Sequence, residues 1–271
     1  MIYPISTRTT TEAWLRAVEF LFKARDRCAY NMILDIEEPI SLSPAEKQVS
    51  ELVDRLLTSH DKLPVASVAG TIFPASHYLR YGATGVFEHY PKRVYPKLEK
   101  TWGTYAGRML IRQVGKDKVI NPLEILVDKL RHQAANGSPK RAVYELGFVD
   151  VMADLPIYDP ATDAKKPWNQ PCLAHLSFKM LEDHRGLMLT ALYRNHYYVE
   201  RALGNLLGLS QLLYFVARES GLEPRGLVCH STFARVDFDG GWKVGEVSKL
   251  IEQSRALLSA QSSAALLPVR N

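Results

Sequence analysis

Cysteine is scarce in this chain. Its 271 residues contain three, Cys28, Cys172 and Cys229, and they lie far apart in the sequence. No CxxC pair and no metal-like spacing of cysteine and histidine occurs, so neither a zinc site nor a disulfide framework is expected. Widely separated, unpaired cysteines are typical of a reducing compartment, and they predict a cytoplasmic protein.

Long apolar runs are also missing. No stretch approaches the roughly 18 residues that cross a bilayer as a helix. The first residues, Met1-Ile2-Tyr3-Pro4, lack the basic start and the apolar segment of a signal peptide. Basic runs and the stacking aromatic arrays of known nucleic-acid-binding motifs are absent too. We therefore expect neither a membrane nor a nucleic acid as partner.

The remaining composition is that of a compact domain. The hydrophobic content is 46% and the charged content 23%, which fits one domain over residues 1–271 with a loose tail after about residue 259. The formal net charge of +5 suits a partner that carries phosphate groups. Many ordinary soluble proteins have a similar surplus, so the charge alone selects no function.

Helices are expected where capping residues precede apolar periodicity. The start signals are Thr9-x-x-Glu12, Ser43-Pro44-x-Glu46 and Asn121-Pro122. Residues 200–220 are apolar on nearly every side, which predicts a long buried helix that ends at Gly221. Residues 244–258 form an amphipathic pattern. Four prolines interrupt residues 64–100, which predicts irregular structure packed on the core, or the wall of a ligand pocket.

Strands are expected at residues 31–36, 141–148, 173–180, 187–193 and 226–238. The segment Asp183-His184-Arg185-Gly186 predicts a hairpin turn in which the glycine takes a positive φ. Pairing around this turn places residue 172 opposite about 197. Strands that are neighbours in sequence, with helices grouped separately, indicate the α+β class.

Cys172 is the main candidate for chemistry. It follows a loop at the start of a strand, where a side chain can reach a ligand. A nearby cation lowers the pKa of a thiol and makes it nucleophilic, and Arg194, at the far end of the paired strand, can supply that charge. Arg194 also has the forked geometry that binds phosphate. The alternatives are a buried structural cysteine and a surface ion pair of Arg194 with Glu200.

Other polar residues stand in unusual positions. Asn205 lies inside the apolar helix, and its carboxamide offers one acceptor and one donor group, which suits the O4 and N3–H edge of uracil. Tyr105 lies in a glycine-flanked turn and could shuttle a proton. The pair Lys140-Arg141 can bind phosphate, or it can complement a helix C-terminus. The alternative for Asn205 is a core amide bonded to the backbone, and the alternative for Tyr105 is a packing tyrosine.

Taken together, these residues resemble the thymidylate synthases and the related pyrimidine nucleotide hydroxymethylases (of dCMP and CMP). Pro171-Cys172 matches the family nucleophile, and Arg194 matches the arginine that contacts the phosphate and the thiolate. Asn205 falls on the asparagine that reads the base. The family fold is a mixed or antiparallel sheet packed with a long buried helix, and a face of the sheet forms a dimer interface.

The resemblance extends to residues upstream of Cys172. Lys140 and Arg141 align with the pair that the partner subunit sends to the phosphate, and Gly103 to Tyr105 resembles the segment with the active-site tyrosine. The resemblance implies a homodimer with shared active sites, a pyrimidine nucleotide as substrate, and 5,10-methylenetetrahydrofolate as cofactor. Cys172 would add to C6, and C5 would then accept a methyl or a hydroxymethyl group.

Several family positions are altered. Asn195 follows Arg194 in place of the family serine and is expected to bind substrate. Tyr197 replaces the aspartate that contacts folate. Arg235 and Asp237 replace the residues that grip the sugar hydroxyl, which predicts a different sugar or an altered phosphate end. Thr71 falls on the catalytic glutamate, for which Glu88 is a possible substitute. These changes leave open a relative that binds a nucleotide without transforming it.

Overall fold

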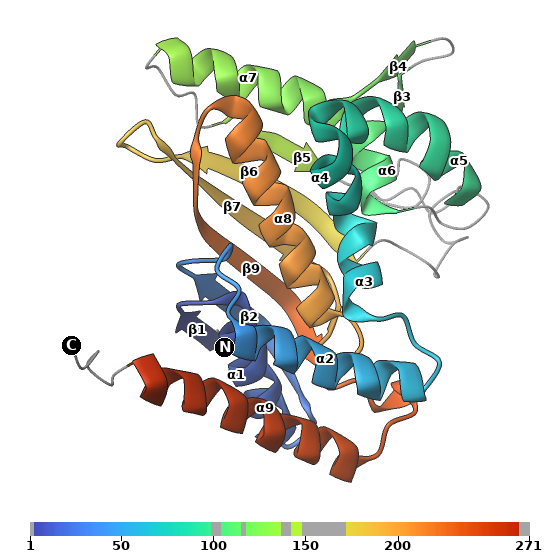
Figure 1. Ribbon diagram of the computed structural model, residues 1–271, viewed down its shortest axis with the longest axis vertical. Helices are drawn as coiled ribbons and strands as arrows, with labels where there is room; N and C mark the ends of the chain where they lie inside the picture. Colours follow the sequence, from blue (N-terminus) through green and yellow to red (C-terminus); the bar gives the residue numbers. More distant parts are fainter. Residues whose placement is uncertain (1–2, 99–103, 115–117, 137–141, 148–171, 266–271) are drawn as a thin grey trace, which may run out of the picture.

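A mixed sheet organises the molecule. The computed structural model describes residues 3–98, 104–114, 118–136, 142–147 and 172–265. The seven-stranded sheet runs in the order β1-β2-β9-β7-β6-β5, and β8 pairs with β9 (Figure 1). Its strands are β1 (Tyr3–Thr7), β2 (Cys28–Ile36), β5 (Glu145–Gly147), β6 (Leu173–Met180), β7 (Gly186–Tyr193), β8 (His196–Tyr197) and β9 (Glu223–Arg235). A separate ribbon pairs β3 (Arg112–Val114) with β4 (Lys118–Ile120).

The sheet contains both strand directions. β1 pairs parallel with β2 and β7 pairs parallel with β9, whereas β2–β9, β6–β7 and β5–β6 are antiparallel. The expected α+β class with a mixed sheet is therefore confirmed. Among the described residues, no helix is both long and apolar enough to cross a membrane.

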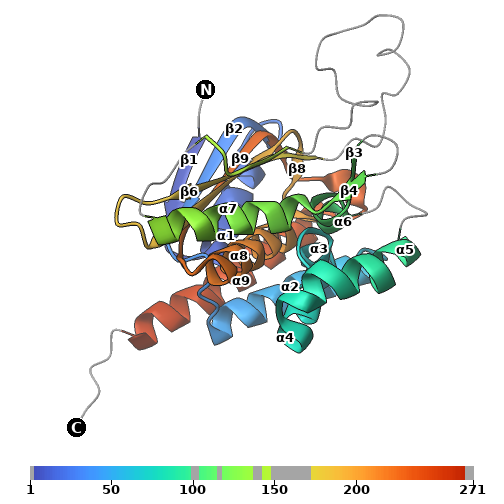
Figure 2. The ribbon, with the colours of Figure 1, turned by 90° about the horizontal axis from the view of Figure 1, so that it is seen from above.

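Helices cover one face of the sheet in layers. α1 (Thr10–Lys23) and α8 (Ala202–Ser220) pack directly on the central strands. α2 (Pro44–Ser59) and α9 (Val244–Ala265) pair with each other farther out on the same side (Figure 2). The opposite face carries exposed side chains such as Asp35, Thr190 and Tyr30, which is 64% exposed. α9 continues to Ala265, past the point where a loose tail is expected.

The capping signals act as the sequence predicts. Ser43 and Glu46 form a complete capping box at the start of α2. The Thr9 side chain accepts a hydrogen bond from the Glu12 backbone N–H at the start of α1. The Asn121 side chain accepts one from Glu124 at the start of α7 (Pro122–Asn136). Gly221 ends α8 in the left-handed conformation with φ 73°.

The proline-rich segment is helical, so the expectation of irregular structure there is wrong. It forms α3 (Val65–Ile72), α4 (Ala75–Thr84), a π-helix (Gly85–Val94) and α5 (Tyr95–Leu98). Pro64 and Pro74 stand at N-cap positions, where the missing N–H costs no hydrogen bond. Pro91 lies inside the π-helix. Proline therefore separates these helices instead of preventing them.

The β6–β7 hairpin has a different register from the one expected. Met180 pairs with Leu187 instead of a residue near 189, and Gly186 belongs to β7. The positive φ of 56° falls on His184, and the Asp183 carboxylate accepts hydrogen bonds from the N–H groups of Arg185 and Gly186. An irregularity between Leu173 and His175 shifts the register again at the far end.

Close packing of two helices positions α8. Glycines 204 and 208 face α3, and a Cβ added at Gly204 would lie 2.8 Å from the carbonyl oxygen of Val65. A Cβ added at Gly208 would lie 2.8 Å from the carbonyl oxygen of Ala69. The absence of side chains at both positions lets the two backbones approach closely. This contact fixes the part of α8 that carries Asn205.

Candidate functional site

The structure brings Cys172 and Arg194 together. Cys172 directly precedes β6 and Arg194 directly follows β7, and the Arg194 N–H donates to the Cys172 carbonyl oxygen at 2.8 Å. The two residues are therefore cross-strand neighbours. The thiol is free and partly exposed.

Tyr105 approaches the same point from another element. It begins α6 (Tyr105–Leu110), which Thr104 caps. The Tyr105 hydroxyl accepts a hydrogen bond of 3.2 Å from the N–H of Leu173, the residue after Cys172. Burial raises the pKa of Tyr105 to about 12. The phenol is therefore protonated at neutral pH, and it can donate a proton or orient a water molecule beside the thiol.

A second cation acts on the thiol. Burial raises the pKa of Cys172, while the charges of Arg194 and, more weakly, Arg201 lower it. Burial prevails, so the resting thiol is protonated at neutral pH. Arg201 stands immediately before α8, one helical turn from Asn205. The spacing of four residues between Arg201 and Asn205 is a sequence signal that could have identified Arg201 as a candidate site residue.

The charges of Arg194 and Arg201 predict how the labelling of Cys172 depends on pH. We expect the rate of iodoacetamide labelling of Cys172, measured in a Cys28→Ala background, to rise with a midpoint above the ordinary thiol pKa of about 8.5. Arg194→Gln should move the midpoint to higher pH because it removes the larger lowering charge, and Arg201→Gln should move it less. Arg225→Gln, on β9 beside the turn of the hairpin, serves as the control. A midpoint unmoved by Arg194→Gln would contradict the electrostatic link.

Asn205 belongs to a buried chain of hydrogen bonds. Its side-chain Nδ2 lies 3.1 Å from Nε2 of His196, whose Nδ1 lies 3.0 Å from the hydroxyl of Ser231. The hydroxyl of Tyr198 lies 3.2 Å from the same Ser231 oxygen. All four side chains are buried. Asn205 is a candidate site residue on sequence alone, whereas its three partners are found only in the structure.

Tyr193 links this chain of hydrogen bonds to the Cys172 thiol. Its ring stacks on the His196 imidazole with centroids 4.1 Å apart and planes 4° apart. It is fully buried, and its hydroxyl has no hydrogen-bond partner within the described part of the chain. Burial, and then the nearby Tyr105 hydroxyl, raise the pKa of Tyr193 well above its ordinary value. Tyr193 thus joins the residues around Cys172 and those around Asn205 into one group.

Asn195, Arg235 and Asp237 lie beside this group. The Asn195 amide oxygen is buried and lacks a partner among the residues that the structure describes. The Arg235 guanidinium lies over the ring of Tyr197, 4.7 Å from its centroid, and forms an ion pair with Asp239. Asp237 accepts hydrogen bonds from the backbone N–H groups of Val199 and Glu200, at 2.9 and 3.1 Å. Its carboxylate thus holds in place the backbone segment that leads into α8.

Asp237 also predicts how stability depends on pH. Burial raises its pKa to about 6 in the folded protein. A raised folded pKa gives a contribution to stability that is complete below the unfolded value near 3.9 and is lost as the pH rises through about 6. The difference corresponds to roughly 3 kcal/mol of unfolding free energy.

Urea denaturation at several pH values measures this contribution. We expect the difference in unfolding free energy between the wild type and Asp237→Asn to change between pH 4 and pH 7, in the direction that disfavours the wild type at higher pH. The exposed Asp239→Asn variant, which removes a carboxylate two residues away, is the control. A difference for Asp237→Asn that stays constant with pH would contradict the raised pKa.

Thr71 and Glu88 do not join the group. Thr71 donates its hydroxyl to the Val68 carbonyl oxygen within α3. Glu88 forms an exposed i, i+4 ion pair with Lys92 at 3.1 Å. Lys140 and Arg141 lie outside the described residues. Within the described ranges, no cluster of three or more histidine, cysteine, aspartate or glutamate side chains could hold a metal ion.

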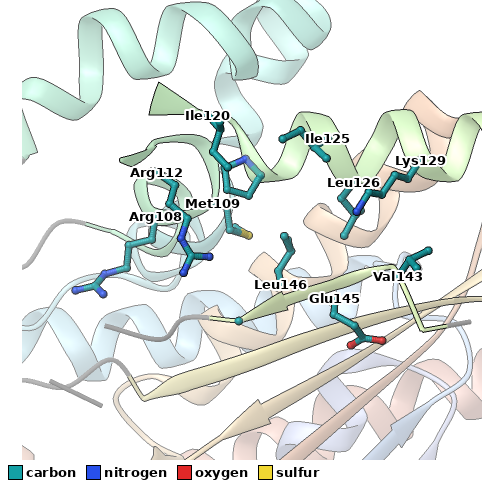
Figure 3. A pocket seen from close by; sticks show the side chains of 12 residues that line it. Arg108, Met109, Arg112, Ile120, Ile125, Leu126, Lys129, Val143, Glu145 and Leu146 are labelled. Carbon is teal, nitrogen blue, oxygen red and sulfur yellow. The ribbon is translucent and has the colours of Figure 1, made fainter. Parts of the chain in front are cut away.

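A basic cavity of about 170 Å³ lies beside α6 (Figure 3). Arg108 and Arg112 line one side and Lys129 of α7 lines another, over an apolar floor that includes Leu126 and Leu146. The carboxylate of Glu145, the acidic residue of the lining, is bound by His175, Ser177 and Lys179 of β6. Such a lining suits an anionic group with an apolar body.

The fold and the group around Cys172 define an α+β protein with a potential thiol nucleophile next to an arginine. No family model matches the chain. Over 258 residues, the chain is 22% identical to a protein of Methanococcoides burtonii named "Putative thymidylate synthase", covering 92% of this chain and 94% of that protein. The similarity thus spans nearly the whole of both chains and agrees with the resemblance seen in the sequence.

Proposed function

We propose that this protein is a one-carbon transferase that acts at C5 of a pyrimidine nucleoside monophosphate. The observation that carries the proposal is the cross-strand pairing of Cys172 with Arg194, with the Tyr105 hydroxyl bonded to the next residue. The distant similarity to a protein named as a thymidylate synthase supports the same class.

The Cys172 sulfur would form a bond to C6 of the pyrimidine. The electron pair of the C5–C6 double bond would move toward the carbonyl at C4, which makes C5 nucleophilic. C5 then takes up a proton or a one-carbon group. Loss of the original C5 proton and cleavage of the sulfur–C6 bond restore the ring and free the thiol. Tyr105 would relay the protons, and Arg194 would hold the phosphate and favour the thiolate.

The one-carbon donor implied by the resemblance is 5,10-methylenetetrahydrofolate, which would supply a carbon at the oxidation level of formaldehyde. Tyr197 stands where the family has its folate-contacting aspartate, and its ring packs under Arg235. The described residues therefore provide no carboxylate at that position. This favours hydroxymethyl transfer over reductive methylation, because the reductive step needs a more ordered, water-excluding site.

A dimer would complete the site. The face of the sheet opposite α1 and α8 carries Tyr30 and Phe233, whose ring centroids lie 5.2 Å apart, and Tyr30 is 64% exposed. We propose that two copies pair through this face and that each contributes Lys140 and Arg141 to the phosphate site of the other. Sedimentation velocity should give a dimer, and a monomer at micromolar concentration would contradict this part of the proposal.

Release of tritium from C5 tests the proposed chemistry. The protein is incubated with UMP, dUMP, CMP or dCMP labelled at C5, with and without methylenetetrahydrofolate, and label in water is counted. Release from one of these nucleotides supports the transferase, and its dependence on folate identifies the donor. Tight binding of a nucleotide without release from any of the four would instead support a nucleotide-binding protein that performs no transfer.

A further inference from the structure

His196 occupies the centre of the buried chain that ends at Asn205. It lies on β8, is 1% exposed, and stacks on Tyr193. Burial lowers its pKa to about 3, so the imidazole is neutral at neutral pH. A neutral imidazole has one N–H donor and one nitrogen acceptor. The identity of its neighbours therefore decides which nitrogen carries the proton.

The contact with Asn205 decides which nitrogen of His196 carries the proton. The amide nitrogen of Asn205 can only donate, so Nε2 of His196, at 3.1 Å, must accept. The imidazole proton then resides on Nδ1 and is donated to the Ser231 hydroxyl at 3.0 Å. Both nitrogens are satisfied, and stacking on Tyr193 prevents the ring from tilting away.

The contacts of Ser231 are compatible with this direction of the hydrogen-bond chain. A serine oxygen can accept two hydrogen bonds and donate one. It accepts from His196 and can also accept from the Tyr198 hydroxyl at 3.2 Å. Its own proton is left for the sulfur of Cys229, with which it is also hydrogen-bonded. Every hydrogen bond of the buried serine is accounted for when His196 carries its proton on Nδ1.

We propose that His196 is a positioning residue that fixes the Asn205 amide so that its carbonyl oxygen and its second N–H face the site, an arrangement that selects uracil over cytosine. This inference rests on the proposed function for the identity of the ligand. Uracil offers an N3–H donor to the carbonyl oxygen and an O4 acceptor to the amide N–H. A single amide in this orientation satisfies both.

Cytosine requires the reverse pattern, because its N3 accepts and its amino group donates. The Asn205 amide would have to turn over and present its oxygen to Nε2 of His196. The imidazole proton would then have to move to Nε2, and Ser231 would have to donate to Nδ1 instead of accepting from it. Binding cytosine thus requires the Asn205 amide to turn over and also requires the buried hydrogen bonds of His196 and Ser231 to reverse. The preference therefore originates in His196 and Ser231, neither of which needs to touch the base.

The first test needs no ligand. Two-dimensional ¹H–¹⁵N spectra of the protein labelled at histidine nitrogens report which nitrogen of each imidazole is protonated, and the His196→Gln variant assigns the His196 signal. We expect a neutral His196 with its proton on Nδ1 throughout the neutral range. A proton on Nε2, or a mixture of the two tautomers, would overturn the proposal.

The second test measures base discrimination by calorimetric titration with UMP, dUMP, CMP and dCMP. We expect the wild type to bind the uracil nucleotide more tightly by roughly 10- to 100-fold. Ser231→Ala removes the acceptor for the Nδ1 proton and should bring that ratio close to one, while the affinity for UMP or dUMP falls much less. His230→Gln on the same strand, whose histidine bonds to Asn31 at 3.1 Å, is the matched control and should keep the ratio.

The two tests separate the possible failures. A wild type that binds no pyrimidine nucleotide refutes the proposed function, and the tautomer of His196 still decides whether it orients Asn205. A wild type that prefers cytosine, or a Ser231→Ala variant with the full uracil preference, refutes the role of His196 while leaving the transferase proposal intact. A folded Ser231→Ala protein, checked by its circular dichroism, is required for the comparison.

Discussion

Replacing Cys172 with alanine is expected to lower the release of tritium from C5 by at least roughly 10³-fold, because it removes the atom that forms the covalent bond to C6. Without that bond the C5–C6 double bond keeps its electrons and C5 has no means of taking up a proton. Nucleotide affinity should change little, because Arg194 and Asn205 remain. A large loss of rate with unchanged binding is the signature of a nucleophile.

Cys28→Ala is the matched control for this experiment. Cys28 is also a free, partly exposed thiol, and it starts β2, opposite Arg235. Its removal should leave tritium release unchanged. If Cys172→Ala keeps more than a tenth of the wild-type rate, the covalent mechanism is wrong. If both variants lose activity equally, the loss reflects damage to the sheet and not to the chemistry.

Local signals explain why much of the fold could be predicted. The side chains of Ser43, Thr9 and Asn121 accept hydrogen bonds from backbone N–H groups three residues later. The left-handed Gly221 ends α8 through contacts of the same short range. The alternation in β6 and β7 reflects burial of one strand face. These features depend on neighbours a few residues away, so the sequence contains what is needed to predict them.

The hairpin register shows where such reasoning fails. Placing Gly186 in the turn makes residue 172 face about 197, whereas the Asp183 side chain holds a turn in which His184 takes the positive φ. The irregularity after Leu173 then brings Cys172 opposite Arg194. Both corrections depend on side-chain hydrogen bonds and packing, which the alternation of apolar residues does not encode.

The candidate site was predictable to the extent that its residues lie at the ends of recognisable elements. Cys172, Arg194 and Tyr105 lie together because the end of β7 and the start of α6 converge on the start of β6, whereas Asn205 contacts His196. His196 is different, since its importance arises from Ser231 and Tyr198, which reach it only once β8 has paired with β9. The contacts of Asp237 could not be predicted either, because its carboxylate accepts a hydrogen bond from the backbone N–H of Val199, 38 residues earlier in the sequence.

The glycine pair of α8 predicts the largest effect on stability. In the double variant Gly204→Ala/Gly208→Ala, each new Cβ would meet the α3 backbone at 2.8 Å, at the carbonyl oxygens of Val65 and Ala69. These backbone atoms cannot move aside without separating the two helices. Overpacking typically costs about 1–3 kcal/mol per site, so we expect the unfolding free energy to fall by about 2–6 kcal/mol.

Gly70→Ala provides the control for this double variant. Gly70 lies within α3 itself, and a Cβ added there meets nothing within 4 Å. Because alanine favours a helix over glycine by about 1 kcal/mol, this variant should be as stable as the wild type or slightly more so. Urea denaturation of both proteins makes the comparison. Equal stability of the double variant and Gly70→Ala would mean that α3 and α8 are not in close contact, and the placement of Asn205 beside His196 would then lose its structural basis.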